Sequence, residues 1–335
     1  MPGAHLQTVW PVLVAPRAAV ALKRQTWDTP DGDFIDLDFL ELSHSADQHP
    51  NPKPDSDLAH TPATVPIQSE SPLWVIFHGL EGSSNSQYAR SMLAFARDQG
   101  HHAVVPHFRG CSGRINARPR AYHSGDSVEI DWILRRMAVE HAGRPIFAVG
   151  VSLGGNALLK WLGERGAAAG FVCAAAAVCP PQNLRAGAVS LSRGLNRGYS
   201  EYFLRTLRPK SLAMLERFPG IFDGERVRQA RDFFDFDDAV TAPLHGFASC
   251  EDYWAKSSCR PFLGGIRVPT LVINALNDPF MPKDQLAQPD QVSPHVSLEY
   301  PETGGHVGFP GAGRGQPRGW LPQRLACFLG EHIGV

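Results

Sequence analysis

The stretch Gly150-Val151-Ser152-Leu153-Gly154 decides the fold. It follows a short apolar run at 145–149 that is typical of a buried parallel strand, and residues 153–162 carry apolar side chains at helical spacing. The order of strand, Gly-x-Ser-x-Gly and helix predicts a nucleophile elbow, in which a serine lies at the tip of a strained turn. Side chains at Gly150 and Gly154 would collide with neighbouring backbone in so tight a turn. A glycine-rich loop that merely connects a strand to a helix is the alternative.

The remaining chain repeats the alternation of strand and helix around this motif. Strands are expected at residues 73–77, 103–105, 171–178, 268–275 and 296–300, and helices at 87–98, 127–141 and the C-terminus. Such alternation predicts an α/β fold with a mainly parallel, doubly wound sheet. Alternating apolar residues on both sides of Pro30-Asp31-Gly32-Asp33 predict a β-hairpin that adds an antiparallel edge.

Two segments interrupt this pattern, and 335 residues suffice for one large domain, 1–335, that contains both. Residues 43–72 are rich in proline and serine and are expected to be a flexible surface insertion. Residues 184–262 contain helix-like segments at 199–207, 211–218 and 227–236, and they predict an inserted helical cap. Residues 1–24 are mixed and receive no assignment.

Composition limits the classes of partner. The formal net charge of −1 gives no reason to expect a nucleic-acid partner. The six cysteines are scattered without zinc-like spacing, which favours reduced thiols in a cytoplasmic protein. Pro11 interrupts the apolar residues 9–14, so a secretory signal is not expected, and the run 171–179 is too short to span a bilayer. We expect a soluble protein, and a transient contact with a membrane surface stays open.

A serine nucleophile needs a base, and the base needs an orienting acid. In α/β-hydrolases these follow the serine in the order Asp or Glu, then His. Asp278 comes directly after the strand predicted at 268–275, and Asp284, further into the same loop, is the alternative acid. His306 lies in Thr303-Gly304-Gly305-His306, and among the histidines after Asp278 only this one is in a glycine loop. The predicted catalytic residues are Ser152, Asp278 and His306.

The tetrahedral intermediate needs two backbone N–H donors. We expect one from Leu153, next to the nucleophile, and one from Leu80, in the loop after the strand 73–77. His78 could be mistaken for a second base, and its expected role is to shape that loop. His101, His102 and His107 have no carboxylate partner in the sequence pattern, so no metal site is predicted, and no cofactor is required.

Eight segments of the chain carry a family resemblance, and they occur in order over nearly its whole length. They are residues 5–8, 78–82, 107–113, 122–125, 150–156, 236–243, 277–280 and 304–309. Together they resemble the α/β-hydrolase superfamily and, within it, the YheT-like group. That group includes bacterial hydrolases, animal abhydrolase-domain lipases and fungal medium-chain ethyl-ester synthase/esterases. The resemblance implies the triad named above and activity on short- to medium-chain acyl esters or acylglycerols.

The leading hypothesis is therefore a serine carboxylic ester hydrolase that forms an acyl-serine intermediate. Its substrate would be a small-molecule or lipid ester. An acyltransferase with an alcohol acceptor, a non-catalytic interaction module on the same scaffold, and hydrolysis of amides are the alternatives. The aromatic residues of the cap either cover the acyl site or form the core of the cap itself.

Overall fold

The computed structural model describes residues 3–14, 18–42, 71–309 and 319–332, and these residues form one eight-stranded sheet. The strands are β1 (Leu22–Asp28), β2 (Phe34–Leu40), β3 (Leu73–Phe77), β4 (His102–Pro106), β5 (Ile146–Val151), β6 (Ala174–Val178), β7 (Thr270–Ile273) and β8 (Val296–Glu299). Their spatial order is β1-β2-β4-β3-β5-β6-β7-β8. The predicted insertion 43–72 lies outside the described residues, except for Ser71 and Pro72.

The sheet confirms the predicted mixture of a parallel body and an antiparallel edge. Strands β4, β3, β5, β6, β7 and β8 are parallel to one another. Strands β1 and β2 form the predicted hairpin, and β2 is antiparallel to β4. All residues of β3, β5 and β6 are buried, as their continuous apolar sequences require of strands covered on both faces.

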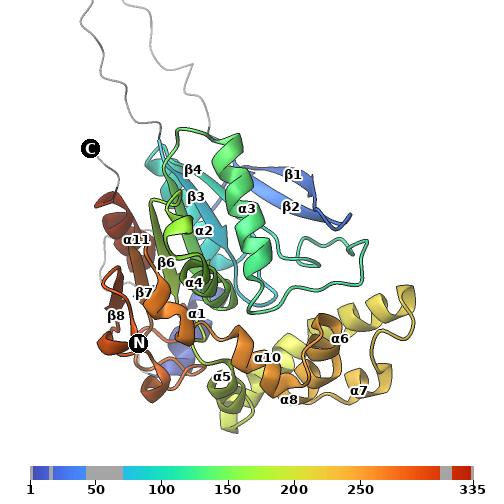
Figure 1. Cartoon of the computed structure of the whole chain (residues 1–335). Coiled ribbons are helices and arrows are strands. Elements are labelled where there is room, and N and C mark those ends of the chain that lie inside the picture. Colours follow the sequence, from blue (N-terminus) through green and yellow to red (C-terminus); the bar gives the residue numbers. More distant parts are fainter. Residues whose placement is uncertain (1–2, 15–17, 43–70, 310–318, 333–335) are drawn as a thin grey trace, which may run out of the picture.

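Helices cover both faces of this sheet (Figure 1). Residues of α3 (Ser127–Glu140) and α4 (Leu153–Arg165) belong to the core on one face. Residues of α2 (Gln87–Asp98) and α11 (Trp320–Gly330) belong to the core on the other face. The two buried layers fix the strand β5 and the residue that follows it at the centre of the molecule. No helix among the described residues is long and apolar enough to cross a membrane.

The chain between β6 and β7 is helical and lies beyond one end of the sheet (Figure 1). Its elements are α5 (Leu184–Leu191), η2 (Gly194–Asn196), α6 (Arg197–Arg217), α7 (Gly224–Gln229), α8 (Phe233–Phe236), the π-helix η3 (Asp237–Thr241), α9 (Ala242–His245), α10 (Cys250–Ser257) and η4 (Arg260–Gly265). The other short helices of the described residues are η1 (Gly166–Ala169), η5 (Lys283–Gln285) and η6 (Pro289–Gln291).

Two predicted helix boundaries in this segment are wrong. The expected break between 207 and 211 does not occur, because α6 continues through Pro209. Pro209 lies on the exposed side of the helix, where water can satisfy the carbonyl that loses its backbone partner. The expected helix 227–236 is divided between α7 and α8, because Asp232 starts a new helix by accepting a hydrogen bond from the Asp235 N–H at 3.1 Å.

Helix α1 (Ala4–Val14) occupies the N-terminal region that the sequence left unassigned. Pro11 lies inside it and cannot bond to the carbonyl of Gln7. The backbone of Gly308 packs against that carbonyl so closely that a Cβ on Gly308 would lie 1.9 Å from its oxygen. The N-terminal helix is therefore fitted against the loop that contains His306.

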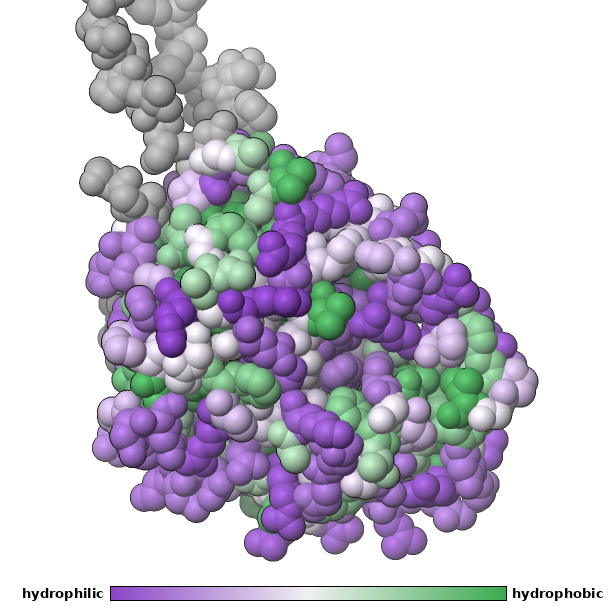
Figure 2. All heavy atoms as spheres, viewed as in Figure 1, coloured by the Kyte–Doolittle hydropathy of each residue, from purple (hydrophilic) through white to green (hydrophobic). Residues whose placement is uncertain are grey.

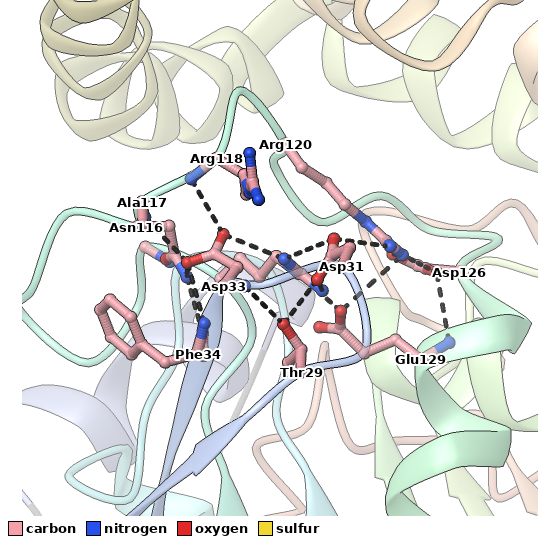
Figure 3. Close-up of polar contacts among 12 residues, drawn as sticks. Thr29, Asp31, Asp33, Phe34, Asn116, Ala117, Arg118, Arg120, Asp126 and Glu129 are labelled. Atoms are coloured by element: carbon pink, nitrogen blue, oxygen red, sulfur yellow. Dashed lines mark hydrogen bonds and ion pairs between the residues drawn. The ribbon is translucent and has the colours of Figure 1, made fainter.

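A buried ion network joins the β1–β2 turn to the loop 107–124 and to the start of α3 (Figure 3). The Arg109 guanidinium, 2% exposed, donates to Glu129 at 2.7 Å, Asp33 at 3.0 Å and Asp31 at 3.1 Å. Asp33 also accepts hydrogen bonds from the backbone N–H of Ala117 at 2.8 Å and from other donors of the same loop. This network holds the loop 107–124 in place beside the candidate site.

We expect Asp33→Ala to lower the free energy of unfolding by about 1–3 kcal/mol, because it removes one of the three carboxylates that Arg109 contacts and an acceptor of the buried Asn116 amide. Denaturant unfolding followed by circular dichroism measures this loss. Asp290→Ala, in η6 at an exposed position, is the control and should change stability little. Equal stability of both variants would contradict the structural importance of the network.

Candidate active site

The turn after β5 has the geometry of the predicted elbow. Ser152 adopts φ 51° and ψ −118°, a left-handed conformation that is strained for a residue with a side chain, and α4 begins at the next residue. A Cβ on Gly150 would lie 2.5 Å from the Gly154 carbonyl oxygen, and one on Gly154 would lie 2.6 Å from the His78 carbonyl oxygen. The prediction that side chains at positions 150 and 154 would collide with neighbouring backbone is therefore confirmed.

The structure brings Ser152, His306 and Asp278 together. The Ser152 Oγ lies 2.9 Å from Nε2 of His306, and the Asp278 carboxylate lies 2.8 Å from Nδ1 of the same ring. Because a carboxylate only accepts, Nδ1–H donates to Asp278, and Nε2 is left to accept the serine proton. The Asp278 side chain is fully buried. The alternative acid, Asp284, lies on the exposed η5 and is not the partner of His306.

Residues near the N-terminus tie the acid loop to the histidine loop. The Gln7 side-chain oxygen accepts from the Asn277 amide at 2.9 Å and from the Gly304 N–H at 3.0 Å. Thr8 Oγ1 accepts from the His306 N–H at 2.9 Å. The sequence did not reveal this role, because these partners are separated by about 270 to 298 residues. The one available signal was the segment 5–8, which carried family resemblance without an assigned function.

The predicted oxyanion residues Leu80 and Leu153 line the same cavity as Ser152 and His306. The loop before Leu80 is fixed by His78, whose Nδ1–H donates to the Gly79 carbonyl at 2.8 Å and whose Nε2 accepts from the Phe108 N–H at 3.1 Å. Complete burial lowers the pKa of His78 to about 3, so the ring stays neutral at ordinary pH. With both nitrogens engaged in backbone contacts, His78 shapes the loop and is unsuited to act as a second base.

The other histidines considered for a metal have separate partners. The His107 Nε2 lies 2.8 Å from Asp38, and the His101 ring accepts from the Trp74 indole at 3.2 Å. Within the described part of the chain, only Cys179, Asp278 and His306 bring three potential ligand atoms within 4.8 Å of one another. The side chains of Asp278 and His306 are already hydrogen-bonded to each other.

Two adjoining cavities lie at the candidate site, and only one of them includes Ser152. The smaller, of about 100 Å³, contains Ser152 and His306 and is walled by Phe280 and by residues of α5. The larger, of about 520 Å³, lies between α6 and the loop 109–124. Figure 2 shows hydrophobic side chains exposed in the region of α6, with hydrophilic ones around them. The residues that line both cavities are Leu80, Ser124, Leu153, Phe233, Asp237 and Tyr253.

Asp237 is a polar residue on this shared wall, and no role was predicted for it. Its carboxylate accepts from Thr241 Oγ1 at 2.7 Å and from the Trp254 indole N–H at 2.8 Å. Complete burial raises its pKa to about 6. Both donors belong to the helical segment, so this carboxylate links η3 to α10 beneath the cavities.

A family model described as the alpha/beta hydrolase fold matches residues 72–311, which include every residue of the triad geometry. The chain belongs to the α/β-hydrolase family. Among its relatives is the Escherichia coli (strain K12) protein named "Putative esterase YheT", which is 36% identical over 98% of this chain and 91% of its own length. A mouse protein named "Phospholipase ABHD3" is 28% identical over 90% of this chain and 70% of its own length.

Among solved structures, an esterase of Pyrococcus furiosus superposes on this α/β-hydrolase with a TM-score of 0.57 and 15% sequence identity, over 95% of this chain and 97% of its own. At that identity the likeness shows the fold alone. The predicted α/β-hydrolase fold and family are thus confirmed, and the relatives are of the esterase and lipase type.

Proposed function

We propose that this α/β-hydrolase is a serine carboxylic ester hydrolase that acts through an acyl-Ser152 intermediate. One observation carries the proposal: the hydrogen-bonded series from Asp278 through His306 to Ser152, with the serine at the tip of a strained elbow. A base bonded to the nucleophile and an acid bonded to the base are the requirements for activating a serine hydroxyl near neutral pH.

The reaction follows from these contacts. His306 Nε2 takes the Ser152 proton as Oγ attacks the ester carbonyl carbon, while the N–H groups of Leu80 and Leu153 stabilise the oxyanion. The bond to the alcohol oxygen then breaks, and His306 returns the proton to the leaving alcohol. Water attacks the acyl-Ser152, gives a proton to His306, and releases the carboxylic acid as Ser152 regains its hydrogen. Asp278 stabilises the imidazolium in both steps.

We place the acyl chain in the larger cavity and the alcohol in the smaller one. The alcohol oxygen must be within reach of His306, and His306 lines only the smaller cavity. The acyl chain then extends past Leu80 and Leu153 into a space of about 520 Å³, which is within the usual range for ligand pockets. In this proposal residues 184–262 act as a cap whose α6 covers the acyl chain.

The test is hydrolysis of p-nitrophenyl esters from acetate to palmitate, with fluorophosphonate labelling of the serine. We expect labelling at Ser152 and fastest turnover on a medium-length acyl chain. Ala213→Trp fills part of the larger cavity and should move the optimum to shorter chains without slowing acetate hydrolysis. No turnover and no labelling would favour an interaction module, and transfer of the acyl group to added ethanol in preference to water would favour an acyltransferase.

The side chains of Tyr122 and Lys210, outside the triad, hold Glu81 in the turn that carries the Leu80 N–H. Glu81 has φ 55°, an unfavourable conformation for a residue with a side chain. Tyr122 Oη accepts from the Glu81 N–H at 2.9 Å and donates to the Glu81 carboxylate at 2.9 Å. Lys210 of α6 forms an ion pair with the same carboxylate at 2.8 Å. The proposed cap therefore contacts the residue next to the proposed oxyanion donor.

We expect Tyr122→Phe to lower kcat about tenfold, because the turn loses both hydrogen bonds and the Leu80 N–H is no longer held in place. Complete removal of an oxyanion donor costs about 10²–10³ in kcat, so a loosened donor should cost less. Steady-state kinetics on a soluble acetate ester measure the effect, and KM should change little. Tyr300→Phe, which loses a hydrogen bond to the Ala287 carbonyl and lines neither cavity, is the control. An equal loss of kcat in both variants would contradict a specific role of Tyr122.

A further inference from the structure

Helix α1 presents an apolar face to solvent. Its eleven residues, Ala4–Val14, include no Asp, Glu, Lys or Arg. Leu6, Trp10 and Leu13 are spaced four and three residues apart on one side of the helix and are 43%, 42% and 75% exposed. Gln7 and Pro11, on the other side, are buried. The solvent-facing side of α1 is therefore apolar, a kind of surface that soluble proteins normally bury.

The short helix η2 and the start of α6 adjoin this surface. Leu195 and Tyr202 are 79% and 67% exposed. Tyr199, one turn before Tyr202, stacks on His5 of α1 with ring centroids 5.8 Å apart, and its hydroxyl lies 3.3 Å from Nδ1 of that ring. Two segments whose contacting residues are 194 positions apart in the sequence therefore adjoin.

The exposed apolar residues are concentrated in these two segments. Nine large hydrophobic side chains are exposed in the described part of the chain, and six of them lie here: Leu6, Trp10, Val12, Leu13, Leu195 and Tyr202. Single exposed hydrophobic residues need no explanation, whereas a concentration of this kind indicates an interaction surface.

Charge at the edge of this surface is positive. Arg193 and Arg197 flank Leu195 and are exposed. Neither forms an ion pair with a carboxylate among the residues that the structure describes. An apolar face containing a tryptophan, bordered by arginines, matches the composition of segments that lie in the interface of anionic membranes.

The same surface borders the candidate active site on the His306 side. Tyr199 packs edge-on against Phe280 with centroids 4.7 Å apart, and Phe280 stacks on the His306 ring at 4.1 Å. Thr8, also on α1, accepts the His306 N–H. A lipid surface that contacts α1 would therefore lie beside the cavity that contains Ser152.

We propose that α1 and residues 193–202 form a docking face for an anionic lipid surface. With eleven residues, α1 can lie in such a surface but is too short to span it, since spanning takes about twenty. The arginines attract a negatively charged surface, whereas two copies of this chain paired through this face would bring positive edges together. Docking would give the enzyme access to lipid esters, and this benefit rests on the proposed function. The docking itself does not depend on that function.

The test is co-sedimentation of the full chain with phosphatidylcholine vesicles, with and without phosphatidylglycerol. We expect binding to the anionic vesicles that weakens with added salt. Trp10→Ala combined with Leu13→Ser should weaken binding to both kinds of vesicle by more than tenfold. Arg193→Glu combined with Arg197→Glu should weaken binding to the anionic vesicles about tenfold or more. The matched control is Val128→Ser combined with Val139→Ser, which changes two exposed hydrophobic residues of α3 and should have no effect.

A second readout separates docking from catalysis. Hydrolysis of soluble p-nitrophenyl acetate should be the same in the docking variants as in the unsubstituted chain, and circular dichroism should show an unchanged fold. Absence of vesicle binding by the unsubstituted chain would overturn the docking proposal, whatever its esterase activity. A dimer in solution that Leu13→Ser dissociates would also overturn it, because the face would then be a self-association surface. Binding to vesicles without hydrolysis of any ester would leave docking supported and contradict the proposed function.

Discussion

Ser152→Ala is expected to abolish ester hydrolysis and to leave the fold intact. The variant removes the Oγ that lies 2.9 Å from His306 Nε2, so no acyl-enzyme can form. Loss of the serine in a comparable triad lowers kcat by about 10⁶-fold. The backbone at position 152 already has φ 51°, and alanine meets no greater strain there than serine does. Turnover of p-nitrophenyl esters measures the loss of hydrolysis, and thermal unfolding measures whether the fold is intact.

Ser124→Ala is the matched control for this experiment. Ser124 lines the same cavity as Ser152, and its described hydrogen bonds to Asn156 and Tyr253 involve its backbone atoms, which the substitution keeps. We expect Ser124→Ala to retain most of the activity and to remain reactive toward a fluorophosphonate. Turnover by Ser152→Ala at a rate close to that of the unsubstituted chain would contradict the acyl-serine mechanism.

The sheet and the elbow could be predicted because their causes are local in sequence. The strands β3 and β5 are continuous apolar runs, and the helix α2 has the predicted bounds of 87–98. The glycines of the elbow are required by contacts within the turn and with the adjacent strand. In such segments each residue agrees with the fold that its neighbours impose, so a short window of sequence suffices.

The supports of the site could not be predicted, because their causes are contacts between distant parts of the chain. Pro11 suggested a break, yet α1 continues past it to lie against the histidine loop. Gln7 gives no local sign that its side chain joins Asn277 to Gly304. Arg109 likewise finds its carboxylates about 20 and 80 residues away. Spacing along the sequence identifies a candidate triad, whereas the residues that hold it are identified only by the folded chain.

Acidity should weaken two of these hidden supports, the buried side chains of Asp33 and His78. Burial alone would raise the pKa of Asp33, but hydrogen bonds from Ala117 and Asn116 and the charge of Arg109 outweigh it, so the pKa lies below its ordinary value. This contribution is present above the unfolded pKa of about 3.9 and is lost as the pH falls through the lower folded value. Buried His78 acts in the same direction between its unfolded value of about 6.5 and its folded value of about 3.

Asp278→Asn is expected to lower kcat by about 10⁴-fold while ester binding persists. The carboxylate accepts the Nδ1–H of His306 at 2.8 Å, which leaves Nε2 free to take the serine proton. An asparagine amide can turn its N–H₂ toward Nδ1, so the imidazole would carry its proton on Nε2 and could no longer act as the base. The other carboxylate oxygen accepts the Phe280 N–H at 2.8 Å, a contact that the asparagine carbonyl can keep, so the loop should hold its shape.

Asp284→Asn tests the alternative acid with the same chemical change six residues further on. Asp284 is exposed on η5 and its carboxylate contacts the neighbouring Gln285 amide at 3.1 Å, so we expect its replacement to leave kcat nearly unchanged. Single-turnover measurements at several pH values separate the two variants, since only a change at the acid that orients His306 should slow acylation and deacylation together. Near-normal kcat in Asp278→Asn, with the loss found in Asp284→Asn, would transfer the role to Asp284 and would require the loop 278–284 to rearrange before catalysis.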